Sequence, residues 1–475
     1  MTDPDAAAFG AVLAALAERG AGRMVPDLER IARLCALLGD PQLAAPVVHV
    51  TATNGKGSVS RMVAALSSAV GLTTGTHTSP HLIDVRERLS VGGEPISRAA
   101  FAEVHAEVEA LAALVDAELA ERDGPGADRV TYFELITAMA FAWFADVPVD
   151  LAVIEVGMGG RWDATNVARA EVAVIGEVAL DHRELGSTPA EVAMEKVGII
   201  EPGSIVVTAA QGPDVERVVA AAVADAGATR WSVGQDLVLV ARRPQPSGQE
   251  LDVEVRGRRI DRLVLPLFGA HQARNALLAL GAFAAVLGER FDAVDDGLVR
   301  AGLAAVRVPG RLERVADAPL VVVDGAHNPH AAVALAVALG DGEVVGRRPV
   351  TLLLGVLADK DVEGIVAGLA GIATTVVTTT APDERALAAE ELAAIVRREA
   401  PGAVVEAVTD PGAALERARE LAGPLGAVVA TGSLRTVGAV RQRLVGDGEH
   451  DRLARVVPLV AEDASHRTLV VGLDG

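Results

Sequence analysis

The chain has little of what several classes of protein require. It contains one cysteine, Cys35, in 475 residues, which excludes an intramolecular disulfide and a cysteine-based metal site. Cys35 lies in IARLCALLG at helical spacing, so we expect it to pack in a core. No apolar run reaches the about 18 residues of a membrane-spanning helix, and the start, MTDPDAAAFG, lacks the features of a signal peptide. We therefore expect a cytoplasmic protein with no membrane partner.

The chain also lacks an excess of positive charge. Its 43 Lys and Arg residues against 64 Asp and Glu give a formal net charge of −21. Because binding to a nucleic-acid backbone needs clustered cations, we expect no nucleic-acid partner. Aromatic residues make up 3 % of the sequence, and alanine and valine fill the apolar positions instead. A length of 475 residues exceeds one typical core, so we expect at least two domains.

Short apolar runs alternate with helical stretches along the first 306 residues. The stretches 99–122 and 131–145 are long enough for helices, and 237–265 indicates a hairpin or small meander before a helix that begins at His271. Continuous β-branched runs are typical of a parallel sheet that is buried on both faces. The pattern therefore predicts an α/β domain with a mostly parallel sheet, whose strands include 47–51, 151–156, 172–175 and 205–208.

A second unit is predicted to begin near residue 307, after the segment VRVPGR. Strand-like runs, each separated by a helical pattern, occupy 320–324, 351–354, 375–379, 404–408 and 428–431. The alternation predicts a smaller Rossmann-like α/β domain of about 150 residues. We thus predict domains at 1–306 and 307–475, and the tail from about residue 446 has no assignment.

The segment 47–60, VVHVTATNGKGSVS, predicts a phosphate-binding loop between a strand and a helix. Small residues let backbone N–H groups approach an anion, and the positive end of the following helix points at it. The loop departs from G-x-x-x-x-G-K-[ST], because Ala52 stands at its entry and an extra glycine follows its lysine. Nucleotide phosphates are expected to contact Thr53, Asn54, Gly55, Lys56, Gly57 and Ser58.

Polar residues follow other predicted strands. Glu155 ends the run LAVIEV beside a glycine-rich turn, where a carboxylate can hold Mg²⁺ on a nucleotide phosphate. His182 follows another run, although Mg²⁺ prefers oxygen ligands. Asp324 follows LVVV and precedes a helix, a context that favours a nucleotide site in the second domain. Taken alone, Glu195 and Lys196 would be a solvated surface pair.

Together these segments resemble the folylpolyglutamate synthase/dihydrofolate synthase branch of the Mur ligase family. The similarity runs in order from about residue 20 to 440 through ATNGKGS, TSPHL, RERLSV, TYFE, EVGMGGRWDATN, ALDHRELGST, EKVGI, HQARNALLAL, VPGRLE, VVDGAHNPHAA, DKD and TGSLRTVG. The resemblance implies ATP-dependent amide formation between a folate-type carboxylate and the amino group of L-glutamate. It implies ATP, Mg²⁺ and small-molecule substrates, and we expect a monomer.

The resemblance also implies residue roles. Lys196 matches a carbamylated lysine that acts as a carboxylate-like metal ligand, and His327 approaches the reacting acyl group, so that Lys56, Lys196 and His327 are the catalytic candidates. Further nucleotide contacts are expected from Asn275, Arg311 and Asp324, and magnesium contacts from Ser79, Glu155 and His182. Pterin contacts fall on Arg23, Met24, Val25, Pro26, Thr131, Tyr132, Phe133, Glu134, Trp162, Asp163 and Ala164.

Two departures and three alternatives accompany this interpretation. Ala52 would restrict the phosphate loop if its position needs positive φ, and Glu177 adds negative charge near the expected metal. A muramyl–amino acid ligase of cell-wall synthesis would use the same chemistry. A non-catalytic ATP-dependent switch, or a folate-binding protein, would need only part of the site. The sequence leaves open whether glutamate is added to dihydropteroate, to folates or to both.

Overall fold

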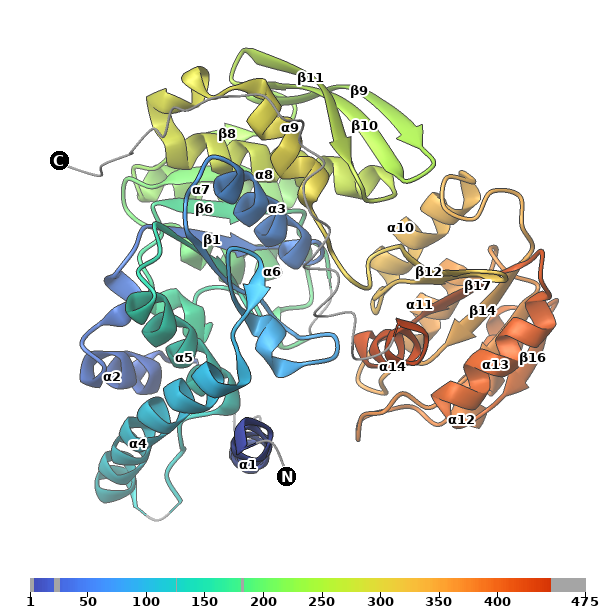
Figure 1. The fold of residues 1–475 in the computed structure, drawn as a ribbon, viewed down its shortest axis with the longest axis horizontal. Helices are drawn as coiled ribbons and strands as arrows, with labels where there is room; N and C mark the ends of the chain where they lie inside the picture. The colour runs from blue at the N-terminus through green and yellow to red at the C-terminus, as the bar shows by residue number, and fades with distance from the viewer. Residues whose placement is uncertain (1–3, 21–25, 125, 181–182, 446–475) are drawn as a thin grey trace.

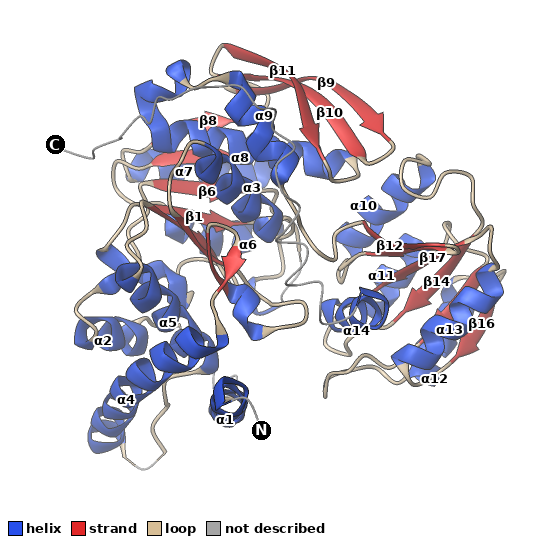
Figure 2. Ribbon diagram, in the orientation of Figure 1, coloured by secondary structure: helices blue, strands red, loops and turns tan. Residues whose placement is uncertain are grey.

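The computed structural model describes residues 4–20, 26–124, 126–180 and 183–445. Within this part of the chain, the strands form an eight-stranded, a three-stranded and a six-stranded sheet. The eight-stranded and six-stranded sheets belong to two α/β units that lie side by side (Figures 1 and 2). This arrangement confirms the predicted fold class.

The eight-stranded sheet has the order β4-β3-β2-β5-β1-β6-β7-β8. The six strands from β2 to β8 pair in parallel, whereas β3 and β4 form an antiparallel edge. All residues of the central strands β5, β1 and β6 are buried, as their continuous apolar runs predict. The bounds are β1 (Val47–Thr51), β2 (Thr74–His77), β3 (Leu89–Val91), β4 (Glu94–Pro95), β5 (Leu151–Glu155), β6 (Val172–Ile175), β7 (Ile205–Thr208) and β8 (Thr229–Ser232).

Helices cover both faces of this sheet. Because neighbouring strand residues point to opposite faces, Val48 packs with α3, α8 and α9, whereas Val47 packs with α1, α2, α4 and α5. Cys35 lies in this second cluster and is fully buried, as expected. The bounds are α1 (Pro4–Arg19), α2 (Glu29–Leu37), α3 (Lys56–Ala69), α4 (Arg98–Asp123), α5 (Tyr132–Asp146), α6 (Pro189–Lys196), α7 (Pro213–Asp225), α8 (Ala270–Leu287) and α9 (Asp296–Ala305).

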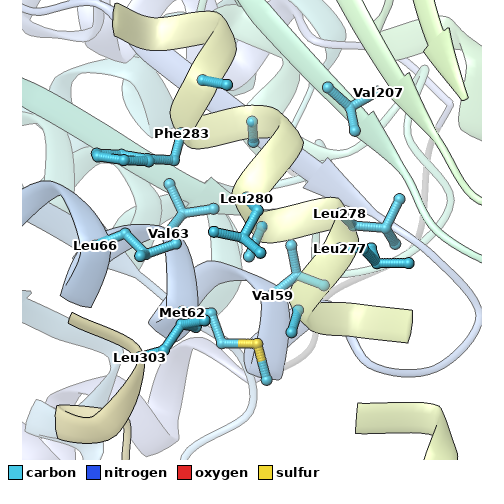
Figure 3. Close-up of a cluster of buried hydrophobic side chains, with 14 of the residues drawn as sticks. Val59, Met62, Val63, Leu66, Val207, Leu277, Leu278, Leu280, Phe283 and Leu303 are labelled. Carbon is cyan, nitrogen blue, oxygen red and sulfur yellow. The ribbon is translucent and has the colours of Figure 1, made fainter. Parts of the chain in front are cut away.

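The contact between α3 and α8 fixes the helix that follows the phosphate loop. Leu66 of α3 points toward Phe283 of α8, whereas Met62 of α3 lies beside Leu303 of α9, and all four side chains are fully buried (Figure 3). A three-stranded antiparallel meander of β9 (Leu237–Gln245), β10 (Gly248–Val255) and β11 (Arg258–Leu265) adds its apolar residues to the same cluster. The predicted meander and the helix after it are therefore confirmed.

The six-stranded sheet has the order β12-β13-β17-β14-β15-β16 and is parallel except for β12. The sequence did not predict β12, because this edge strand is short and mostly half-exposed. The strands are β12 (Glu313–Asp317), β13 (Leu320–Val323), β14 (Val350–Leu354), β15 (Thr375–Thr378), β16 (Val404–Ala407) and β17 (Ala427–Thr431). The helices are α10 (Pro329–Gly340), α11 (Val362–Leu369), α12 (Ala389–Glu399), α13 (Pro411–Ala422) and α14 (Leu434–Val445).

A segment that follows β2 packs against the second unit. Leu82, from this segment, packs in one apolar cluster with Val321 of β13 and with Val437 and Val440 of α14. Gly438 allows the approach, because a β-carbon there would overlap the carbonyl oxygen of Leu82. The unit that carries the phosphate loop therefore supplies part of the other unit's core.

Across the described ranges, no helix is both long enough and apolar enough to cross a membrane.

Replacing Gly438 by alanine tests this contact. Alanine favours a helix over glycine by about 0.8–1.0 kcal/mol, but here its methyl group collides with Leu82, and overpacking costs about 1–3 kcal/mol. We expect Gly438→Ala to lower the unfolding temperature measured by calorimetry. The control is Gly10→Ala in α1, where a β-carbon would meet no atom within 4 Å. If the unfolding temperature of Gly438→Ala were equal to or higher than that of the wild type, as expected for Gly10→Ala, the close contact would be contradicted.

Candidate functional site

The phosphate loop joins β1 to α3 and has one conformation that only glycine adopts readily. Gly55 has a φ of 86°, and a β-carbon there would lie 2.7 Å from Oδ1 of Asn275 on α8. The hydroxyl of Thr53 donates to the carbonyl oxygen of Ala179 (2.8 Å) and anchors the loop to the segment after β6. The hydroxyl of Ser58 is buried and has no hydrogen-bond partner among the described residues.

Ala52 does not strain the loop. It is not among the described non-glycine residues with positive φ, so the missing first glycine costs nothing in backbone conformation. Its methyl group fits because Gly176 lies opposite, where a β-carbon would approach the Cβ of Ala52 to 2.6 Å. The carbonyl oxygen of Ala52 accepts hydrogen bonds from two amines, Nζ of Lys56 (3.1 Å) and Nζ of Lys196 (2.9 Å).

Lys196 is the last residue of α6 and is buried, with 3 % of its surface exposed. It is therefore not the solvated surface residue that its local sequence alone would suggest. The side chain lies behind the phosphate loop, whereas Lys56 lies on the side of the loop that lines a cavity.

Glu155 ends β5 and lies against the phosphate loop. Its Oε2 accepts a hydrogen bond from the backbone N–H of Ser79 (3.0 Å) and lies 3.2 Å from where a β-carbon on Gly57 would be. Burial raises the pKa of Glu155, and the nearby charges of Lys56 and Arg311 oppose that rise. The third expected metal ligand, His182, lies outside the described residues. Among the described residues, no three His, Cys, Asp or Glu side chains lie close enough together to hold a metal ion.

A cavity of about 570 Å³ brings the nucleotide candidates together. Both α/β units contribute to its walls, so residues from distant parts of the sequence face one space. It is lined by all six loop residues, Thr53, Asn54, Gly55, Lys56, Gly57 and Ser58, and by Ser79, Glu155, Asn275, Arg311, Asp324 and His327.

Asp324 directly follows β13 and lies on the far side of this cavity. Its carboxylate accepts backbone hydrogen bonds from Leu312 (2.9 Å) and Ala326 (2.9 Å) and is 7 % exposed. Burial raises the pKa of Asp324, whereas the charge of Arg311 lowers it. These contacts anchor two segments, the one that carries Arg311 and the one that carries His327. Nδ1 of His327 lies 2.8 Å from the carbonyl oxygen of Gly325.

Hydrogen bonds across the cavity link the two units. The side-chain amides of Asn54 and Asn328 donate to each other, at 3.0 and 3.3 Å, and Asn328 also caps the start of α10. Nε2 of His330 lies 3.3 Å from a carboxylate oxygen of Glu177. Their hydrogen bond lowers the pKa of Glu177 and raises that of His330. Glu177 thus contacts the second unit, and the sequence analysis gave no role to Asn328 or His330.

A second cavity, of about 670 Å³, adjoins the first and contains the described pterin candidates. Thr131 and Glu134 form a capping box at the start of α5, and Glu134 pairs with buried Arg30 at 3.1 Å. Trp162 remains 46 % exposed. Arg23, Met24 and Val25 lie outside the described residues. The cavity is lined by Pro26, Thr131, Tyr132, Phe133, Glu134, Trp162, Asp163 and Ala164.

Besides Arg30, four cations line the same cavity, and the sequence analysis assigned a role to none of them: Arg88, Lys360, Arg385 and Arg435. Arg88 is 6 % exposed and lies over the ring of Tyr132, 5.4 Å from its centroid. Its Nε donates to Nδ1 of His81 (3.0 Å), and no described carboxylate forms an ion pair with it. Because a buried charge needs a partner, Arg88 marks a place for an anionic group of a ligand.

The two cavities meet. Ser79, Pro80, Gly157, His327 and Leu434 line both of them. A phosphate on the loop and an elongated molecule in the second cavity would therefore face each other near His327. The arrangement suits the transfer of a phosphoryl group to an acceptor held in the adjoining space.

Two family models match the chain. The "Mur ligase middle domain" matches residues 50–283, and the "Mur ligase, glutamate ligase domain" matches residues 310–434. The dihydrofolate synthase/folylpolyglutamate synthase of Mycobacterium tuberculosis is 45% identical over 379 residues, 78% of this chain and 77% of that protein. The folylpolyglutamate synthase of Lacticaseibacillus casei is 37% identical over 426 residues, 88% and 95% of the two chains.

Solved structures of relatives have the same fold as this chain. Mycobacterium tuberculosis folylpolyglutamate synthase complexed with ADP superposes with a TM-score of 0.87 at 40% identity, over 93% of this chain and 99% of the other. Escherichia coli FolC in complex with DHPP and ADP has a TM-score of 0.80 at 28% identity, over 94% and 99%. The resemblance found in the sequence is thereby confirmed, and the chain belongs to the Mur ligase family, in its folylpolyglutamate synthase/dihydrofolate synthase branch.

Proposed function

We propose that this protein is an ATP-dependent ligase that joins L-glutamate to dihydropteroate and to folates. The observation that carries the proposal is the junction of two cavities, one built on a phosphate loop and one lined by the pterin candidates, at Ser79 and His327. The relatives named above include proteins with both synthase activities and structures with ADP and DHPP, which supports these substrates.

ATP would bind with its phosphates on the loop between β1 and α3. The N-terminus of α3 and the ammonium of Lys56 attract the negative phosphates, and the unpartnered hydroxyl of Ser58 can bond one of them. Asn275, Arg311 and Asp324 line the rest of the same cavity, where they can contact the nucleoside part. We therefore retain the proposed nucleotide-binding roles of these residues.

The donor set also suits Mg²⁺. The carboxylate of Glu155 and the hydroxyl of Ser79 are oxygen ligands beside the phosphate loop, and phosphate oxygens and water would complete the coordination. When bound, the ion would neutralise negative charge on the phosphates. His182 remains a proposed ligand. For Lys196, we propose carbamylation, supported by its burial directly behind the loop, where Nζ reaches the carbonyl oxygen of Ala52.

The reaction needs an activated acyl group, because a carboxylate is a poor electrophile. A carboxylate oxygen of the pterin substrate attacks the γ-phosphorus of ATP, the bond to the β-phosphate oxygen breaks, and ADP leaves. The amine of L-glutamate then attacks the acyl carbon of the acyl phosphate, phosphate leaves, and the nitrogen loses a proton. Lys56 spreads the developing phosphate charge, and His327 lies where the two cavities meet.

The second cavity also offers charge for the carboxylates of the amino acid. Arg88 comes from the first unit, and Lys360, Arg385 and Arg435 come from the second, so cations face the cavity from both sides. Guanidinium groups bind carboxylates through strong charge-assisted hydrogen bonds. Arg385 and Arg435 also pair with Asp383, so Arg88, which no described carboxylate pairs, is the cation best placed to meet a carboxylate of L-glutamate.

The other hypotheses fit less well. A muramyl–amino acid ligase would need room for a nucleotide sugar, and the relatives named above are folate enzymes. A switch would not need the cations of the second cavity. We further propose a division of the chain at 306/307, since the two large sheets use residues on either side of it. A cytoplasmic monomer remains our proposal.

The direct test of the function is product formation from ATP, Mg²⁺ and L-glutamate, with dihydropteroate in one reaction and tetrahydrofolate in another. We expect ADP release in both reactions and a product that carries one added glutamate residue by mass spectrometry. Product in one reaction alone would restrict the enzyme to that activity. If folded, ATP-binding protein gave no product in either, the folate assignment would be wrong.

Lys56→Ala tests the phosphate loop. Loss of a group that stabilises transition-state charge typically lowers kcat by about 100–1000-fold, so we expect at least that decrease in steady-state turnover. Circular dichroism should show an intact fold. The control is Arg397→Ala on α12, a side chain outside both cavities. Turnover near that of the control would rule out the proposed role of Lys56.

Lys196→Ala tests the carbamate. The variant lacks the amine that would take up CO₂, and we expect it to be inactive and partly restored by millimolar acetate or formate, which can occupy the vacated space. Intact-protein mass spectra and a high-resolution structure of the active wild-type complex should show the carbamate. An unmodified Lys196 in an active complex would contradict the proposal.

A further inference from the structure

The side-chain amide of Asn54, on the phosphate loop, faces the second unit. Its Oδ1 accepts a hydrogen bond from Nδ2 of Asn328 at 3.0 Å. Its Nδ2 lies 3.3 Å from Oδ1 of Asn328 and 3.2 Å from Nδ1 of His330. Both polar atoms of this side chain therefore contact the second unit, and the backbone N–H is the group that Asn54 offers to a phosphate.

His330, the second residue of α10, closes these contacts into a ring. Its Nε2 lies 3.3 Å from Oε1 of Glu177, in the segment after β6. The backbone carbonyl oxygen of Glu177 in turn accepts from the backbone N–H of Thr53 at 3.0 Å. Because Thr53 precedes Asn54 in the chain, the ring returns to the phosphate loop. One residue of the second unit thus contacts both the loop and the segment that supports it.

A single backbone group sets the direction of these hydrogen bonds. The N–H of Ala331 donates to Oδ1 of Asn328 at 2.8 Å, so Nδ2 of Asn328 faces Asn54. It donates to Oδ1 of Asn54, which turns Nδ2 of Asn54 toward His330. An amide nitrogen can only donate, so Nδ1 of His330 must accept. The proton of a neutral His330 therefore lies on Nε2, where it is donated to Glu177.

The contact with Glu177 matters for its direction more than for its charge. The hydrogen bond to Glu177 raises the pKa of His330, whereas burial and the charge of Arg274 lower it. The side chains of His330 and Glu177 are 39 % and 48 % exposed, and attraction between exposed charges contributes little. As an acceptor, however, the carboxylate takes the Nε2 proton and leaves the lone pair of Nδ1 to Asn54.

We propose that His330 is a positioning residue for ATP binding: its Nδ1 holds Asn54 and the phosphate loop against the second unit, and Glu177 selects the tautomer that does so. The proposal rests on the proposed function, because the cavity concerned is the proposed ATP site. ATP would contact both units there, so its apparent affinity depends on the fraction of molecules in which the two units are held together. Loss of His330 should therefore weaken ATP binding and leave saturated turnover nearly unchanged.

A nuclear magnetic resonance spectrum of protein labelled with ¹⁵N in its histidines tests the tautomer. The signals of His330 are those that disappear in His330→Asn. At about pH 8 we expect a neutral ring with its hydrogen on Nε2. A hydrogen on Nδ1, in the other tautomer or in the cation, would overturn the proposal, because it would present a donor to the amide of Asn54.

Two substitutions test the effect on ATP. His330→Leu removes the acceptor, whereas the side-chain oxygen of His330→Asn can take the place of Nδ1. One hydrogen bond contributes about 0.5–1.5 kcal/mol, equivalent to about 2–12-fold in affinity. His330→Leu loses two, so we expect its Kd for ATP by calorimetry and its KM for ATP to rise about fivefold or more, with kcat changed less than about twofold. His330→Asn should bind ATP within about twofold of wild type. Equal affinities in the two variants would overturn the role of His330.

A double-mutant cycle tests whether Glu177 acts through His330. We expect Glu177→Ala to raise the Kd for ATP by a factor at least about twofold larger in the wild type than in His330→Leu. Any direct effect of the lost charge on ATP is present in both backgrounds and cancels. Equal factors would overturn the role of Glu177. The control is Glu363→Ala on α11, a 67 % exposed side chain outside both cavities, which should bind ATP as the wild type does.

These binding measurements contain no folate. A wild type that binds ATP but forms no folate product would therefore refute the proposed function alone, and the differences among the variants would still decide the role of His330.

Discussion

The reciprocal amide pair between Asn54 and Asn328 holds the phosphate loop of the first unit against the start of a helix in the second. Two further contacts act in parallel: Leu82 inserted beside α14, and His330 paired with Glu177. Without this approach, the loop would be an ordinary anion site at a helix N-terminus, open to water. With it, the loop becomes one wall of a cavity whose other wall carries Arg311 and Asp324.

A cavity between the two units suits the proposed reaction, because an acyl phosphate must be protected from water. The cavity is built at the carboxyl ends of parallel strands in both units, where Glu155 ends β5 and Asp324 follows β13. Both carboxylates are buried, and nearby cations and backbone N–H groups offset the cost of burying them. Such preorganised charges do not need to rearrange during the reaction, which is the main source of electrostatic catalysis.

The central strands and the phosphate loop could be predicted from the sequence, because both depend on local patterns. Continuous apolar runs located the central strands, and strand, glycine turn and helix start together located the phosphate loop. The edge strand β12 was missed because its residues are half-exposed and carry no strong pattern. Four other residues were missed for another reason: Arg88, Arg435, Asn328 and His330. Each contacts a residue more than 100 positions away or lines a cavity, and spacing along the chain does not reveal such contacts.

The central claim is that the two cavities meet so that a phosphoryl group passes from ATP to the carboxylate held in the second cavity. The most direct measurement follows the oxygen atoms. Dihydropteroate labelled with ¹⁸O in its carboxylate is converted with ATP and L-glutamate, and the released phosphate is analysed by mass spectrometry. The account predicts that each phosphate released carries one ¹⁸O atom from the substrate carboxylate. Product formation with unlabelled phosphate would contradict it.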